Sequence, residues 1–284
     1  MNRLTSEART AVVSALIEGC SIRSTVRMTG VAKKTVMRLL LEVGAVCAAY
    51  QDRTFRNLVS RRVQVDEMWG FIYAKQKNVT LKMAEQRFCG DVWLWTAIDS
   101  DSKLAISWAL GQRDAVTAHE FMTDLAGRLK KRVQLTSDGL KLYLTAVEDA
   151  FGSEIDYAML VKIYGAPSEG QKRYSPAECL GCERKSITGD PDPKYVSTSY
   201  SERLNLSVRM TNRRYTRLTN AFSKKLENHF AAAALGYFAY NFIKIHSTLR
   251  MTPAMAAGVT DRLWEVSDLV ALLEADEREV ERAA

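Results

Sequence analysis

The feature that most constrains the fold is an ordered alternation of strand-like and helix-like segments between residues 63 and 164. Five of these segments are rich in β-branched and aromatic residues, and two repeat their apolar residues at helical spacing. The strands are expected at 63–73, 91–98, 103–110, 132–136 and 156–164, and the helices at 117–132 and 140–151. Thr117 and Glu120 have the spacing of a capping box at the start of the first helix. The order β-β-β-α-β-α-β predicts an α/β fold with a mixed five-stranded sheet flanked by helices.

Residues 1–47 predict an all-α module that precedes the sheet. One apolar helical stripe ends at Gly19, Ser21 begins a second helix, and Gly30 supplies the turn before a third helix. The basic residues that face outward from the third helix are Lys33, Lys34 and Arg38. A recognition helix in the major groove of DNA requires such a face, so we interpret the module as a DNA-binding helix-turn-helix. A helical hairpin used for dimerisation is the alternative.

The remaining segments complete a division of the chain into four parts. Residues 48–62 are basic and predict a linker, which either follows phosphates or is merely solvated. Residues 63–250 form the predicted sheet domain, and 251–284 a C-terminal helical tail. Within the sheet domain, residues 165–201 hold four of the five prolines and predict an insertion loop. Further helices are expected over 202–217 and 219–247 and from residue 263.

Charge is distributed unevenly along the chain. The formal net charge is +7, and the first 62 residues, with eleven Lys or Arg against four acids, account for all of it. Residues 203–225 hold seven basic residues and no acid. Two basic stretches suggest a polyanionic partner such as DNA, although each alone also fits a solvated helix face. Because no run of eighteen apolar residues and no secretory signal is present, we expect a cytoplasmic protein with no membrane partner.

Three carboxylates stand at positions where a metal site can form. Asp66 lies in the first strand, Asp138 follows the fourth strand at its carboxyl end, and Glu202 begins a helix. Two or three carboxylates suffice to hold Mg²⁺ or Mn²⁺, and two such ions can support phosphodiester cleavage or strand transfer. Glu67 is expected to point to the opposite face of its strand from Asp66, so that only one of the two can join Asp138.

The helix that Glu202 begins carries a row of polar and basic residues. At intervals of three and then four residues from Glu202, this row consists of Asn205, Arg209, Arg213 and Arg217. This spacing places them on one helix face, where guanidinium groups can bind DNA phosphates next to a metal-bound carboxylate. A solvated basic face is the alternative.

Several motifs in this order resemble one protein family over nearly the whole chain. They are Val-Asp-Glu-Met-Trp at 65–69, Asp-Val-Trp-Leu-Trp-Thr-Ala-Ile-Asp at 91–99, Leu-Thr-Ser-Asp-Gly at 135–139, Ser-Glu-Arg-Leu-Asn-Leu-Ser-Val-Arg at 201–209, Phe-Ser-Lys-Lys-Leu-Glu-Asn-His at 222–229 and a segment from Tyr240 to Pro253. The chain resembles the DDE insertion-sequence transposases, most closely the bacterial family of insertion sequence one. That family's Asp, Asp and Glu correspond to Asp66, Asp138 and Glu202, and its basic residue seven positions later corresponds to Arg209.

This resemblance implies an RNase H-like fold and a DNA transposase. It would use Mg²⁺ or Mn²⁺ to cleave double-stranded DNA at the terminal inverted repeats of an element and to join the ends to target DNA. A homo-oligomer associated with the nucleoid is expected, because two ends must be handled together. A DNA-binding regulator derived from such an enzyme is the alternative function, and a nuclease without joining activity is another.

Two assignments near the insertion remain open in the sequence. The interval between Asp138 and Glu202 is longer than in many relatives, so Glu178 and Glu183 compete with Glu202 for the third carboxylate. Cys179 and Cys182 form a Cys-x-x-Cys pair, which is either half of a zinc site or a reduced structural pair.

Overall fold

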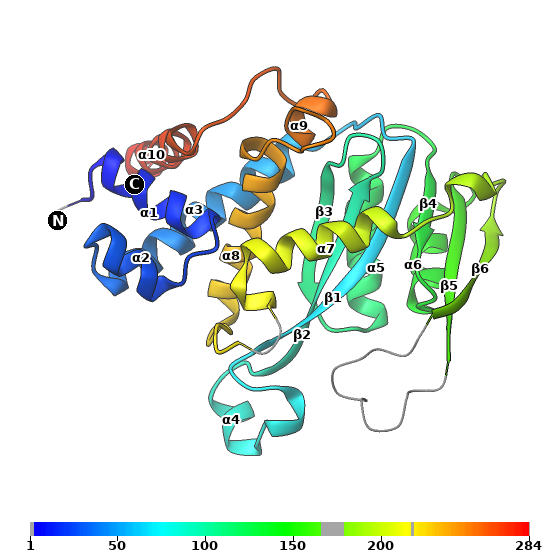
Figure 1. Cartoon of the computed structure of the whole chain (residues 1–284), viewed down its shortest axis with the longest axis horizontal. Helices are drawn as coiled ribbons and strands as arrows, with labels where there is room; N and C mark the ends of the chain where they lie inside the picture. The colour runs from blue at the N-terminus through cyan, green and yellow to red at the C-terminus, as the bar shows by residue number, and fades with distance from the viewer. Residues whose placement is uncertain (1–2, 166–178, 217–218, 284) are drawn as a thin grey trace.

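A six-stranded mixed sheet forms the centre of the molecule. The computed structural model describes residues 3–165, 179–216 and 219–283 (Figure 1). The strands are β1 (Arg62–Ile72), β2 (Gly90–Asp99), β3 (Ala105–Gly111), β4 (Gln134–Ser137), β5 (Asp156–Tyr164) and β6 (Cys179–Thr188). Their order in the sheet is β3-β2-β1-β4-β5-β6. β4 is parallel to both β1 and β5, and the other pairings are antiparallel.

Helices cover both faces of this sheet. The helices α5 (Ala115–Arg128) and α6 (Leu142–Phe151) lie on one face, and α7 (Ser199–Thr211) crosses the other beside α8 (Leu226–Phe238) (Figure 1). Successive side chains of β1 point to opposite faces of the sheet. Val65 belongs to the core that includes Phe121 of α5, whereas Met68 packs with Leu204 of α7 on the other face. The α/β prediction with helices on both sides of a mixed sheet is therefore confirmed at this level.

The prediction of five strands was wrong, because β6 lies within the segment predicted as an insertion loop. It pairs antiparallel with β5 at the edge of the sheet. Nearly all of its side chains are exposed, so neither face shows the apolar alternation that reveals a strand in a sequence. The same predicted loop also contains a 3-10 turn (Pro193–Tyr195) and the first three residues of α7, and its residues 166–178 lie outside the described part.

Three helices form at the N-terminus where the sequence predicts them: α1 (Ser6–Ile17), α2 (Ile22–Thr29) and α3 (Lys33–Thr54). The Ser21 side chain caps α2 by accepting a hydrogen bond from the Ser24 amide, and Gly30 ends it with a φ of 70°. Val36, Leu39 and Leu40 are buried, whereas Lys33, Lys34 and Arg38 are exposed. A DNA-binding role for this module stays a prediction.

The predicted linker over 48–62 was wrong for its first half. α3 continues without a break to Thr54, because Val43, Cys47 and Gln51 remain buried at helical spacing against the rest of the protein. Gly44 lies directly against Ala231 of α8. One continuous helix therefore joins the N-terminal module to the sheet domain.

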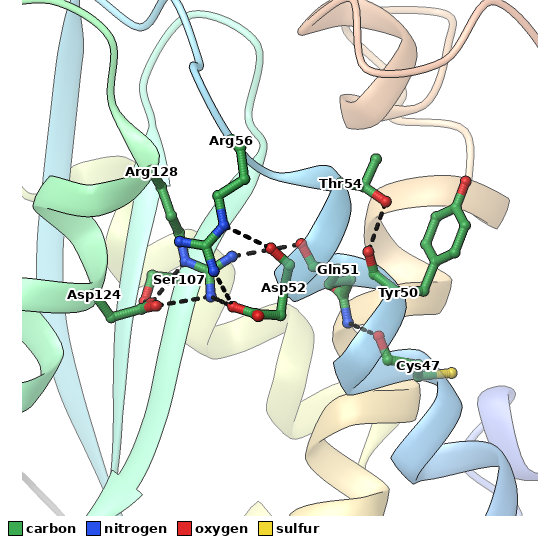
Figure 2. Close-up of polar contacts among 9 residues, drawn as sticks. All are labelled: Cys47, Tyr50, Gln51, Asp52, Thr54, Arg56, Ser107, Asp124 and Arg128. Carbon is green, nitrogen blue, oxygen red and sulfur yellow. Dashed lines mark hydrogen bonds and ion pairs between the residues drawn. The ribbon is translucent and has the colours of Figure 1, made fainter.

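A polar cluster fixes the C-terminal end of α3 to α5 (Figure 2). The Arg128 guanidinium donates to the carboxylates of Asp52 (2.8 Å) and Asp124 (2.7 Å) and to the Gln51 carbonyl (3.4 Å). Arg56 also donates to the Asp52 carboxylate (2.5 Å). Because the Arg128 side chain is only 10% exposed, removing an acid partner would leave a nearly buried charge less well compensated.

The remaining elements are short or follow the domain at its C-terminal end. They are a 3-10 turn (Gln76–Asn78), α4 (Leu81–Gln86), a 3-10 turn η3 (Arg213–Tyr215), a π-helical turn (Ala239–Ile243) after α8, α9 (Pro253–Ala256) and α10 (Val266–Ala283). The acidic α10 packs on α1, where the nearly buried Arg9 donates to Glu277 (3.0 Å) (Figure 1). Within the described residues, no helix is long and apolar enough to cross a bilayer.

Several predicted helix boundaries were wrong, among them the start of the helix predicted over 219–247, which begins at Leu226. The capping box at Thr117 and Glu120 does not form, because α5 begins at Ala115 and Asp114 accepts a hydrogen bond from the Thr117 amide (2.9 Å). The helix predicted over 202–217 ends at Thr211. There the Asn212 side chain donates to the Ala232 carbonyl (3.2 Å) and accepts from the Arg214 amide (3.3 Å), which starts a new turn.

We expect Gly44→Ala to destabilise the protein although alanine favours a helix by about 1 kcal/mol over glycine. A Cβ at this position would lie 2.5 Å from the Ala231 Cβ, so α3 and α8 would have to separate. Gly236→Ala in α8 is the matched control, because its Cβ would meet no atom within 4 Å. Urea unfolding should give a lower midpoint for Gly44→Ala and an equal or higher one for Gly236→Ala. Equal stabilisation by both substitutions would contradict the close packing.

Candidate metal centre

The pairing of β1 with β4 brings two of the predicted carboxylates together. The parallel register aligns Gln64 with Thr136, so Asp66 and Asp138, each two residues further along, occupy corresponding positions on neighbouring strands. Ladder pairing ends at Gln64 and Thr136. Asp138 therefore follows the carboxyl end of β4, where the Leu140 amide donates to its Oδ1 (2.9 Å). This is the edge at which α/β sheets expose ligand-binding groups.

Glu67 joins this pair, so the prediction that only one of Asp66 and Glu67 reaches Asp138 was wrong. One carboxylate oxygen from each of Asp66, Glu67 and Asp138 lies within 4.8 Å of the others. The two neighbours on β1 do meet opposite faces of the sheet. The longer Glu67 side chain nevertheless approaches Asp138, because the backbones of β1 and β4 are no longer paired at this level.

Glu67 is held on the α5 and α6 side of the sheet. Arg113 donates to its Oε1 from Nε (2.9 Å) and Nη2 (2.7 Å), and the Tyr143 hydroxyl donates to its Oε2 (3.1 Å). The Glu67 side chain is 2% exposed. Burial, followed by the charge of Asp138, raises its pKa to about 7, although Arg113 opposes the shift.

Asp66 is held on the opposite side, by α7. The Asn205 side-chain amide donates to its Oδ2 (2.8 Å), and the Glu67 backbone amide donates to its Oδ1 (2.9 Å). Burial raises the pKa of Asp66 to about 6, with further contributions from the charges of Asp138 and Glu202. Asn205 itself is buried, and its Oδ1 has no hydrogen-bond partner among the described residues. The prediction that Asn205 contacts DNA was based on a helix face, whereas this side chain meets a carboxylate.

Glu202 lies beside this cluster but outside the three-carboxylate group. The Gln64 side-chain oxygen accepts hydrogen bonds from the Tyr200 (2.8 Å) and Ser201 (3.1 Å) amides and so fixes the start of α7 on β1. Glu202 follows directly, and its Oε1 accepts from Lys162 of β5 and from Thr198 (2.7 Å). Burial alone would raise the pKa of Glu202, but these hydrogen bonds lower it overall.

The competing residues near the insertion fall into three places. Glu183 lies on the exposed edge strand β6 and pairs with Lys185 (3.2 Å). Glu178 lies outside the described residues. Cys179 and Cys182 are exposed free thiols, and the group of possible metal ligands found in the described ranges does not include them.

The predicted DNA-contacting residues do not form one row. Arg209 is half-buried on α7, Arg213 is exposed on η3 after the helix has ended, and Arg217 lies outside the described ranges. On α3, Lys33 and Lys34 are exposed at the first turn, and Arg38 lies one turn later with Glu42 at 3.6 Å.

Sequence reasoning missed the residues that orient the carboxylates: Arg113, Tyr143 and Lys162. They lie 46, 76 and 40 residues from their partners, and no local motif links them. The position of Glu67 next to Asp66 could have indicated it, but the alternation of side chains along a strand led us to exclude it from the carboxylate group.

The donor set suits a hard divalent cation. Three carboxylate oxygens lie within 4.8 Å of one another, close enough to bind the same cation. Neither histidine nor cysteine belongs to this group, and hard cations such as Mg²⁺ prefer oxygen ligands. The raised pKa values of Asp66 and Glu67 arise partly from like charge, which a cation would offset. Mg²⁺ or Mn²⁺ therefore fits the residues present.

Asp138→Asn should stabilise the metal-free protein at pH 7.5 by about 1 kcal/mol or more, because its charge raises the pKa of two buried neighbours. The folded-state pKa values lie above the ordinary 3.8 and 4.5, so stability should fall as pH rises from about 4 to about 7. The substitution should reduce that fall. Thermal unfolding in EDTA across this range measures it, with Glu85→Gln on α4 as the control for one exposed charge. An unchanged pH profile would contradict the electrostatic account.

Comparison with known proteins gives structural similarity without sequence support. No protein-family model matches the chain, and no curated protein matches it. A piggyBac transposase in a synaptic complex with hairpin DNA aligns over 95% of this chain and 71% of its own, with 9% identity and a TM-score of 0.45. A Mos1 strand transfer complex aligns over 83% of this chain and 79% of its own, with 14% identity and a TM-score of 0.25. These similarities are too weak to assign the chain to a family.

Proposed function

We propose that the chain is a DDE-type DNA transposase that cleaves phosphodiesters and transfers strands with Mg²⁺ or Mn²⁺. The observation that carries this proposal is the convergence of carboxylate oxygens from Asp66, Glu67 and Asp138 within 4.8 Å at the carboxyl end of β4. The resemblance of the sequence motifs suggests the details of this proposal. The substrates would be insertion-sequence ends and target DNA, and the protein would be a bacterial homo-oligomer associated with the nucleoid.

Asp66 and Asp138 would hold the cation together with one glutamate. The bound cation supplies stabilisation of the charge that develops on the attacking and leaving oxygens of a phosphodiester. The protein's own groups orient the ligands. Asn205 fixes the Asp66 carboxylate on the α7 side, and the Leu140 amide fixes that of Asp138.

We assign the third ligand to Glu202 because it would give up weaker interactions than Glu67 on binding a cation. Both oxygens of Glu67 already accept hydrogen bonds, from Arg113 and Tyr143, and the side chain is nearly buried. Glu202 is 47% exposed, and its cationic partner is one flexible lysine, Lys162. Partly exposed ion pairs of this kind contribute little, so exchanging Lys162 for a divalent cation costs little. Glu67 would then support the site as a second, fixed anion.

Two separate basic surfaces would bind the DNA. Lys33, Lys34 and Arg38 on α3 would read the element end as a helix-turn-helix module, and Arg209 and Arg213 would contact phosphates close to the carboxylates. Their exposure on α3 and η3 supports this for the lysines and for Arg213.

Asp66→Asn and Asp138→Asn should each abolish cleavage and strand transfer, because each removes a ligand charge while keeping the side-chain shape. The assay uses labelled duplexes of the inverted repeats that flank the gene, with Mg²⁺ or Mn²⁺, and the exposed Glu85→Gln as the control. Full activity in Asp138→Asn would refute the assignment. Cleaved products without joined ones would identify a nuclease that lacks transfer activity.

Glu202→Gln and Glu67→Gln should separate the two glutamates. We expect Glu202→Gln to weaken Mn²⁺ binding and to lower cleavage by about a hundredfold or more, whereas Glu67→Gln keeps measurable activity with weaker metal binding. Isothermal titration with Mn²⁺ and single-turnover cleavage measure the two effects. The reverse order would transfer the third-ligand role to Glu67.

A DNA-binding regulator derived from a transposase is the second candidate. The observation that favours it is that Glu202 pairs with Lys162 and lies outside the group formed by Asp66, Glu67 and Asp138. A triple variant of Asp66, Asp138 and Glu202 that retained both DNA binding and every cellular effect would select this function over catalysis.

A further inference from the structure

A basic groove of about 590 Å³ lies between the N-terminal helices and the start of α8. Six cationic side chains line it, and the lining residues include no Asp or Glu. They are Arg23, Lys33, Arg213, Arg214, Lys224 and Lys225. Among the described residues, Lys225 is the only one of the six with a carboxylate partner, Glu227 at 3.2 Å. The groove therefore concentrates positive charge that the protein itself does not neutralise.

Arg214 is the least solvated of these cations. Its Nε donates to the Ser223 hydroxyl (3.0 Å), which also shares a hydrogen bond with Nδ1 of the buried His229 (3.1 Å). Burial lowers the pKa of Arg214. Burial, and then the charge of Arg214, lowers the pKa of His229 to about 3, so the imidazole is neutral and the guanidinium carries the charge. A largely buried cation without an anionic partner is costly, and an anion bound in the groove would offset that cost.

The floor of the groove is apolar, in contrast to its rim. Leu16, Ile17, Leu40, Leu235 and Phe222 line the groove, and Ile17, Leu40 and Leu235 are buried, so we take them as its floor. A simple inorganic anion would leave this floor uncovered. A paired duplex would also leave it uncovered, because its bases are stacked inside the helix. A nucleotide of an unpaired strand has both parts that the groove offers to bind, a flat base and a phosphate.

We propose that this groove binds a single-stranded segment of nucleic acid, with a base against its apolar residues and its phosphates at Arg214, Arg23 and Lys224. The choice of nucleic acid rests on the proposed function. The volume suits a ligand of nucleotide size. Arg213 and Arg214 follow α7 directly, and Glu202 lies nine residues before Thr211, which is roughly 14 Å along the helix. The groove would therefore hold a strand that is separated from its complement close to the carboxylates.

Cys20 gives a local readout of occupancy, because this thiol lines the groove and is partly exposed. The full chain is treated with N-ethylmaleimide in EDTA, with and without an oligothymidylate of about 12 nucleotides, and each cysteine is followed by mass spectrometry. We expect the oligonucleotide to slow the modification of Cys20 several-fold and to leave the exposed Cys182 unchanged. Equal rates at Cys20 with and without saturating oligonucleotide would overturn the proposal.

Charge-neutral variants test the rim. Arg23→Gln and Lys224→Gln change exposed residues and should each weaken oligonucleotide binding, measured by fluorescence anisotropy, and reduce the protection of Cys20. Arg214→Gln should have the same two effects. It should also reduce the slope of log binding constant against log salt concentration by about 0.7 for each phosphate contact that is lost. Lys131→Gln, an exposed lysine outside the groove, is the matched control and should bind normally. Losses no larger than that of Lys131→Gln would contradict the assignment.

Two further ligands separate a strand site from a plain anion site. An abasic oligonucleotide and tripolyphosphate both keep the negative charge but have no base for the floor. Weaker protection of Cys20 by both supports the proposal, and protection equal to that of oligothymidylate overturns it. Because these measurements need no metal and no cleavage, they stand apart from the transposase assay. Protection in an inactive protein, or cleavage without protection, identifies which of the two proposals has failed.

Discussion

The short parallel pairing of β1 with β4 is the constraint on which the site depends. Three aligned residue pairs fix the offset between the two strands, and this offset carries Asp66 and Asp138 to the same level of the sheet. A slip of one residue would turn either aspartate to the opposite face. The pairing ends just before the carboxylates, and this end lets Glu67 approach from the other face. The three acids stay close despite their repulsion because Arg113 and Tyr143 hold Glu67, Asn205 holds Asp66 and the Leu140 amide holds Asp138.

The sequence was sufficient for most of the sheet domain, because its elements have strong and distinct periodicities. Five strands and the helices α5 and α6 lie within a few residues of their predicted positions. The edge strand β6 was missed because an exposed strand has no buried face to mark it. The length of α3 was missed because the residues from Gln51 to Arg62 looked polar and basic, while the α8 residues against which α3 packs lie nearly two hundred residues further along the chain.

For the candidate site, sequence reasoning found the residues that local motifs mark and missed those that only the fold brings near. Asp66 and Asp138 meet as expected, whereas Glu202 meets Lys162, a residue of β5 that no spacing rule connects to it. The expected row from Asn205 to Arg217 assumed an unbroken helix. Asn212 interrupts that helix, because its side chain bonds both the α8 backbone and the next turn. The expected row is therefore divided: Asn205 is buried and donates a hydrogen bond to Asp66, whereas Arg213 lies beyond the end of α7.

The unbroken course of α3 has a mechanical consequence. Its 22 residues extend roughly 33 Å, with the exposed lysines in the first turn and the Arg128 cluster at the last. Such a rod has no hinge, and the contact of Gly44 with Ala231 leaves no space for it to roll over α8. α3 therefore packs the N-terminal module directly against α8 and, through Asp52 and Arg128, against α5. In the proposed complex with DNA, α3 offers no joint between its exposed lysines and the sheet domain, so the DNA itself would have to bend to reach both the lysines and the carboxylates.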